Sequence, residues 1–158
     1  MIDVSLWTLM TDTCERSLLP AECAHAIRLA AAAEWGYITV QRETAEKVVL
    51  RFHAAFGFSE HWASDDGAVS GARLPNRRPV TEFPLNLPCC GCGISLEVPD
   101  GYVLHKIDAV QLLLQFVVNG LLPSELAEPR GADQPVLPGM EEFVVPKVVF
   151  NTVQWEPL

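Results

Sequence analysis

The chain has 158 residues, of which 49% are hydrophobic and 20% charged, and it carries a net charge of −9. This length is typical of one domain, and four Trp with seven Phe exclude an intrinsically disordered chain. The excess of acidic over basic residues disfavours a protein that coats nucleic acid or anionic lipid.

The start of the chain, MIDVSLWTLMTDTCERS, lacks the basic n-region and the long apolar run of a signal peptide. The most apolar stretch, AVQLLLQFVVNGLL, is interrupted by polar residues and is shorter than the ~20 residues of a membrane span. Five cysteines are an odd number, and a chain of this size folds without disulfides. We therefore expect a cytoplasmic protein in a reducing environment, without membrane contact.

Two helices are expected after an N-terminal extension of residues 1–18, and together they form a helical pair over residues 20–57. The first, at 20–35, is Ala-rich and has good helix formers at nearly every position. The second, at 42–56, has apolar residues at helical spacing. This stripe consists of Ala45, Val48, Val49, Phe52 and Phe56.

The middle of the chain is expected to hold a knuckle, a hairpin and a third helix within residues 80–120. The Gly- and Pro-rich stretch 57–88 excludes a long helix. The extended pieces at 94–98 and 102–104 flank Pro-Asp-Gly, which predicts a hairpin. A helix with an apolar face follows from about His105 to Asn119, and Gly120 is its expected terminator.

The C-terminal part is expected to contain a Pro-rich loop at 121–142 and a strand at 143–155. The strand is apolar on both faces, and Pro146 cannot donate a ladder hydrogen bond, so an edge position is expected. Such a strand is suited to contact with another protein or a second copy. The predicted fold class is therefore a single small α+β domain with two N-terminal helices, a zinc-knuckle-like hairpin followed by a third helix, and a C-terminal strand.

The clearest local motif is PCCGCG, in which Cys89 and Cys92 form a C-x-x-C-G pattern. Two thiolates at this spacing can bind one Zn²⁺, and the glycine lets backbone amides turn toward the sulfur atoms. Free structural thiols and a redox pair are the alternatives, while the adjacent Cys90 is interpreted as a small hydrophobe. The motif predicts a structural zinc site.

A zinc site needs further ligands, and two sources are open. His105 and Asp108 lie one helical turn apart at the start of the third helix, in a layout analogous to treble-clef-like zinc modules. Carboxylates are uncommon in structural zinc sites, so the N-terminal segment is the alternative source. Its candidate ligands are Cys14, Cys23 and His25.

Three arginines form the basic exception to the acidic composition. Arg73, Arg77 and Arg78 lie in a stretch without acidic residues between Asp66 and Glu82. This pattern indicates either an anion-binding site or a solvated loop.

Known catalytic motifs are absent from the sequence, including G-x-S-x-G, the Walker P-loop and H-E-x-x-H. The P-C-x-x-C half of a zinc deaminase motif also lacks its H-x-E or C-x-E partner. The expected function is therefore a non-enzymatic, intracellular protein-binding or assembly role, as an adaptor, an inhibitor or a complex subunit.

Two alternative functions remain open. Residues 20–58 resemble the opening of winged-helix and helix-turn-helix domains, which implies a DNA-binding regulator, although four basic and four acidic residues leave this region neutral. A metal-dependent hydrolase could instead use His61 with Asp65, in a loop rich in charged residues.

Overall fold

The structure, a computed structural model, describes residues 6–11, 13–42, 45–64, 67–74, 85–88, 95–98, 101–126 and 151–158.

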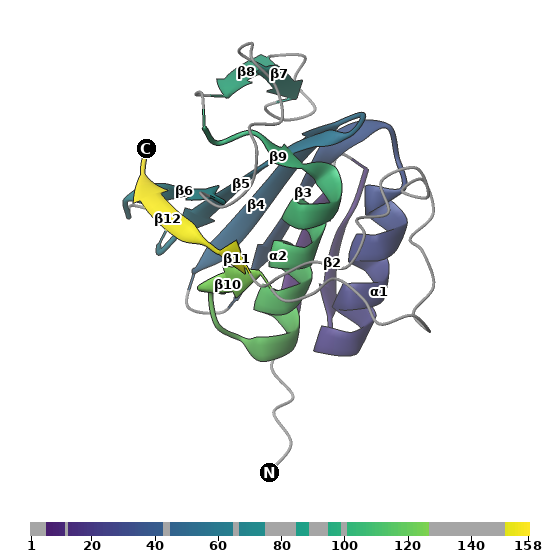
Figure 1. The fold of residues 1–158 in the computed structure, drawn as a ribbon. Coiled ribbons are helices and arrows are strands. Elements are labelled where there is room, and N and C mark those ends of the chain that lie inside the picture. Colours follow the sequence, from purple (N-terminus) through teal and green to yellow (C-terminus); the bar gives the residue numbers. More distant parts are fainter. Residues whose placement is uncertain are drawn as a thin grey trace.

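An eight-stranded antiparallel sheet forms the centre of the fold (Figure 1). Seven strands follow the order β12-β6-β5-β4-β3-β1-β2, and β9 pairs with β5. The strand bounds are β1 Trp7–Thr11, β2 Glu15–Leu18, β3 Trp35–Gln41, β4 Lys47–His53, β5 Phe56–Trp62, β6 Val69–Arg73, β9 Leu104–His105 and β12 Gln154–Pro157.

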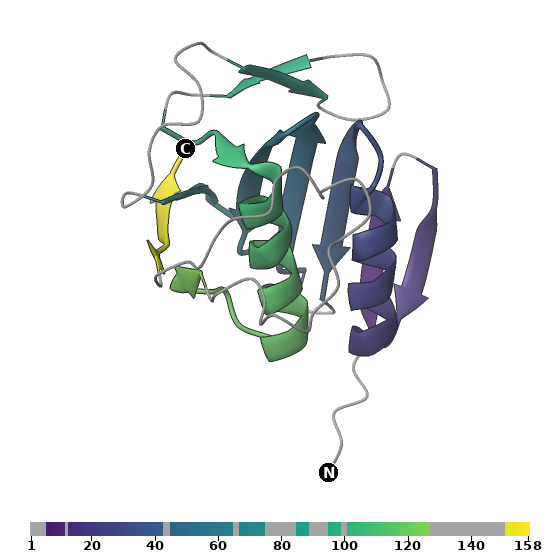
Figure 2. The same ribbon diagram turned by 45° about the vertical axis from the view of Figure 1, so that its right-hand side comes forward.

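Two helices, α1 (Pro20–Ala31) and α2 (Lys106–Asn119), cover one face of this sheet side by side (Figures 1 and 2). A hairpin of β7 (Leu85–Pro88) and β8 (Ser95–Val98) lies at one end of the sheet. A second small ladder pairs β10 (Glu125–Leu126) with β11 (Asn151–Thr152).

The main core lies between the helices and the sheet, because alternate residues of each strand point to the same face. In β4, for example, Val48, Leu50 and Phe52 are at most 1% exposed. From the helix side, Phe116 packs edge-on against Trp7 of β1, with 5.0 Å between ring centroids. On the opposite face, Phe58 forms a smaller cluster with Val98 of β8.

The first and third expected helices are present. α1 begins at Pro20, a position whose N–H would have no partner within the helix, so proline loses no hydrogen bond there. Glu22 Oε1 accepts a hydrogen bond from Leu19 N–H at 3.1 Å. The helix ends before Trp35, which belongs to β3. α2 ends at the expected Gly120, whose φ of 72° is left-handed.

The expected helix at 42–56 is wrong, and with it the predicted three-helix fold class. Residues 47–53 and 56–62 are instead the hairpin strands β4 and β5, joined by a turn in which Ala54 has a φ of 52°. Val48 and Phe52 fit the helical spacing, but with Leu50 they also alternate as one strand face. Val49, on the other face, is buried too. The run Val-Val-Leu-Arg-Phe favours a strand by propensity, and strand pairing on both sides supplies its hydrogen bonds.

Two further expectations require correction. Residues 102–104 do not pair with 94–98, because β8 pairs with β7 and Leu104 pairs with Gly57 of β5. Part of the supposed N-terminal extension is β1, an interior strand between β2 and β3.

The C-terminal segment forms two short strands, β11 and β12, and residues 143–150 lie outside the described part. β12 pairs with β6 at one edge of the sheet. Among the described helices, none combines the length and apolar character needed to cross a membrane.

Replacing Phe52 with Ala should lower the free energy of unfolding by roughly 3–5 kcal/mol, because the side chain is 1% exposed and its loss leaves a cavity. Urea unfolding measures this change. Leu29→Ala, at a position that is 60% exposed, is the control and should change stability by less than about 0.5 kcal/mol. A loss below about 1 kcal/mol for Phe52→Ala would contradict the placement of β4.

Candidate functional site

The expected zinc ligands are only partly within the described residues. Cys89 and Cys92 lie outside them, in the six-residue connection between β7 and β8. His105 is half-buried and precedes α2, whereas Asp108 is 1% exposed and interacts within the fold. A carboxylate enclosed in this way is poorly placed to bind a metal ion that Cys89 and Cys92 would hold.

The three alternative ligands, Cys14, Cys23 and His25, all lie within the described residues. Cys23 is fully buried, and burial raises the pKa of its thiol to about 11, so the thiolate needed for zinc is disfavoured. His25 is exposed two residues later on α1, and Cys14 is exposed before β2. In the described part of the chain, no group of three or more His, Cys, Asp or Glu is placed to hold a metal ion.

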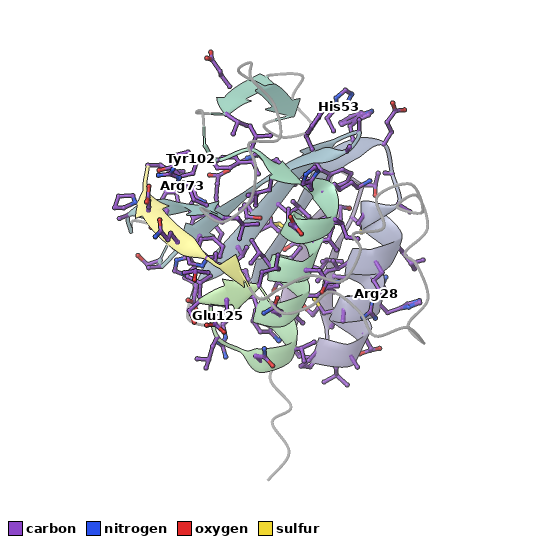
Figure 3. The ribbon with its side chains drawn as sticks, in the orientation of Figure 1. Arg28, His53, Arg73, Tyr102 and Glu125 are labelled. Atoms are coloured by element: carbon purple, nitrogen blue, oxygen red, sulfur yellow. The ribbon has the colours of Figure 1, made fainter. Side chains whose placement is uncertain are left out.

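The anion-binding expectation applies to one described residue, because Arg77 and Arg78 lie outside that part. Arg73 of β6 donates to Glu156 Oε2 of β12 at 3.0 Å, and its guanidinium lies 5.8 Å from the ring centroid of Tyr102 (Figure 3). Tyr102 O–H also donates to Glu156 at 3.2 Å. The charge of Arg73 is thus balanced by Glu156 of the same chain, which weakens the case for an anion-binding role.

This trio, Arg73, Tyr102 and Glu156, joins β12 to β6. The ring of Tyr102 lies directly over Gly71, where an added Cβ would come within 2.7 Å of it. The Arg73 hydrogen bond holds the pKa of Glu156 below its ordinary value, while burial and Glu156 raise the pKa of Tyr102. Trp155 further anchors β12 by donating to Pro123 C=O at 2.8 Å.

His61 belongs to strand β5, not to a loop as its surroundings in the sequence suggested. Its Nε2 lies 2.8 Å from Glu46 Oε2, and its ring is 6.0 Å from that of Trp155. Asp65, the expected catalytic partner, lies outside the described residues. The described contacts of His61 give it a role in packing the C-terminal strand.

The helix-turn-helix interpretation loses its second helix, since residues 47–53 are β4. With that helix absent, residues 20–58 present no recognition helix for a DNA groove.

The two edges of the sheet differ in their free backbone groups. In β12, Leu158 N–H donates to Val69 C=O at 2.9 Å, so the alternating ladder directs Trp155 and Pro157 away from β6. Pro157 has no N–H, and a strand that paired with this edge would therefore lack one ladder hydrogen bond.

The opposite edge, β2, has no proline. Thr11 N–H donates to Cys14 C=O at 2.9 Å, so by the same alternation Glu15 and Ser17 direct their N–H and C=O groups away from β1. Beside this edge lies a groove of about 400 Å³. It is lined by Arg16 of β2 and by Ala21, Glu22, His25, Ala26 and Leu29 of α1.

Exposed apolar side chains accompany the β2 edge. Leu6 and Leu19 are 48% and 43% exposed and continue the register of the Trp7–Leu18 pair, and Leu29 is 60% exposed on α1. This surface was missed in the sequence, although the alternation of Trp7 and Leu9 is a strand signal for β1.

Compared with known proteins, the chain matches no family model, no curated protein and no solved structure.

The Arg73–Glu156 pair should make stability depend on pH. A carboxylate with a lowered pKa contributes stability above its ordinary pKa of 4.5, and this contribution is lost as pH falls through the lower, folded-state pKa. Arg73→Gln should raise the pKa of Glu156 toward 4.5, as measured by NMR titration of the carboxyl carbon. Arg28→Gln, at an exposed arginine on α1, is the matched control; an unchanged Glu156 pKa in Arg73→Gln would contradict the pairing.

Proposed function

We propose that this chain is a non-enzymatic, cytoplasmic protein-binding or assembly protein, such as an adaptor, an inhibitor or a complex subunit. The observation that supports it best is the edge at β2, which no described strand covers and where outward backbone groups lie beside exposed leucines and a groove. Exposed strand edges and apolar patches are typical sites of protein contact.

The described side chains that could take part in catalysis are mostly held in ion pairs or buried. Arg73 pairs with Glu156, His61 pairs with Glu46, and the thiol of Cys23 is buried. Their placement supports a binding role over the hydrolase alternative, which needs an open metal position.

The position of the partner surface is part of the proposal. The C-terminal strand, our sequence-based choice, supplies an edge at β12, but Pro157 reduces its capacity for ladder hydrogen bonds. β2 offers both N–H and C=O groups at Glu15 and Ser17. We therefore favour β2 as the main contact and keep β12 as the second candidate.

Light scattering of the purified chain, together with cross-linking mass spectrometry of the tagged chain in its host, tests the proposed function. A second copy or a stoichiometric protein partner should be found, with cross-links that map to β2 or β12. A monomer without a partner that shifts duplex DNA in a salt-dependent manner would favour the DNA-binding alternative. A monomer that hydrolyses substrates with a bound metal would favour the hydrolase.

A structural zinc ion at Cys89 and Cys92 is a separate proposal. Its support is that Pro88 and Ser95 pair directly, so that both cysteines lie in one short hairpin connection. Of the two further candidate ligands, His105 at the end of β9 is half-buried and Asp108 of α2 is 1% exposed, so we favour His105.

Elemental analysis should find about one zinc per chain, and Cys92→Ser should lose the metal with part of the stability, since metal binding and folding are coupled. Cys90→Ser is the matched control and should retain both metal and stability. Metal-free protein that unfolds at the same temperature as the zinc-treated sample would contradict the site.

A further inference from the structure

We propose that the β2 edge and the adjoining α1 groove bind an extended segment of a partner protein that carries a carboxylate flanked by apolar side chains. The inference rests on the proposed protein-binding function and names the surface and the chemistry of the partner. The segment adds one more antiparallel or parallel strand to the sheet.

The backbone of β2 supplies the affinity. Glu15 and Ser17 each direct an N–H and a C=O outward, so a strand lying beside them can form four ladder hydrogen bonds. Glu15, Arg16 and Ser17 are all exposed, and therefore no described element covers this edge.

The groove supplies the side-chain selection. Arg16 pairs with Leu9, a core residue, so its side chain lies on the helix-bearing face of the sheet. A partner residue opposite Arg16 would point to this same face, into the groove beside α1. There Ala26 and Leu29 offer apolar contact.

Charge complementarity indicates an acidic partner residue. Arg16 and His25 line the groove, and Arg28 follows one turn later on the exposed side of α1, pointing away from α2 (Figure 3). In the part of the chain that the structure describes, neither arginine forms an ion pair. Glu22, the acidic residue of the groove, already accepts a hydrogen bond from Leu19 N–H.

The helix-bearing face of this edge has two arginines, Arg16 and Arg28, against one glutamate, Glu22, in a chain with a net charge of −9. An acidic segment would be repelled by much of the protein and attracted here, which favours this face over others. A second copy of β2 that pairs about a two-fold axis at Arg16 would oppose two arginines, which disfavours that register.

Selection of a phage-displayed library of random linear peptides on the purified protein tests this inference. The selected peptides should alternate apolar residues around an Asp or Glu. With the synthesised consensus peptide bound, hydrogen exchange at the Glu15 and Ser17 amides should slow, as a new ladder requires.

Two variants test the two halves of the surface. Ser17→Pro removes one outward N–H and leaves pairing with β1 intact, and Leu29→Glu places a charge in the groove. Each should weaken peptide binding by about tenfold or more, measured by fluorescence polarisation. Val118→Glu, at an apolar position on α2 that is 66% exposed, is the matched control and should bind as the unmodified protein does.

Charge reversal gives a third readout. Arg16→Glu should weaken binding of the consensus peptide. A peptide in which Lys replaces the Asp or Glu should bind this variant again. Thermal melts establish that each variant is folded, and Leu29→Glu keeps the test valid if Ser17→Pro does not fold.

Failure to select any peptide would overturn the inference. Peptides whose binding is unaffected by both Ser17→Pro and Leu29→Glu would also overturn this site, although protein binding through another surface would stand. Failure of the proposed function is distinct, since it is judged from partners and oligomeric mass in the host.

Discussion

The buried ammonium group of Lys106 joins the three elements on which the fold depends. Lys106 is 3% exposed, and its Nζ donates to Ala33 C=O, just beyond the end of α1, at 2.8 Å. The same Nζ lies 4.7 Å from the ring centroid of Phe52 in β4. Burial lowers the pKa of this lysine, and the carbonyl end of α1 with the π face of Phe52 compensates part of that cost. The start of α2 is thereby fixed against α1 and the sheet.

The remaining packing follows from this position of α2. The helix packs on the sheet and beside α1, so ten of its fourteen residues are buried. Its N-terminal end is held by Lys106 N–H, which donates to Ala55 C=O in the β4–β5 turn at 2.7 Å. At its other end, Gln115 donates to Glu125 C=O, which connects the helix to the β10–β11 ladder and so to the C-terminal strands. The proposed site at β2 lies on the other side of α1 from α2.

The sequence predicted the elements whose local signals agree with their environment. Pro20, the alanines of α1, and Gly120 after α2 mark the helices correctly, since capping and propensity act locally. It misled at residues 47–53, because Val48, Val49 and Phe52 are buried on the two faces of β4 and also satisfy helical spacing. The β2 surface escaped prediction for another reason: the groove forms only when α1 and β2 lie side by side, and no local pattern in the sequence indicates that placement.

The proline at position 157 has a consequence for assembly. A chain that adds subunits head to tail through sheet edges needs both edges to be competent, and such growth does not close on itself. In the described residues, the β2 edge carries the outward ladder groups of Glu15 and Ser17, whereas the β12 edge lacks one N–H at Pro157. Repeated edge-to-edge addition is therefore disfavoured at β12, which works against fibre formation.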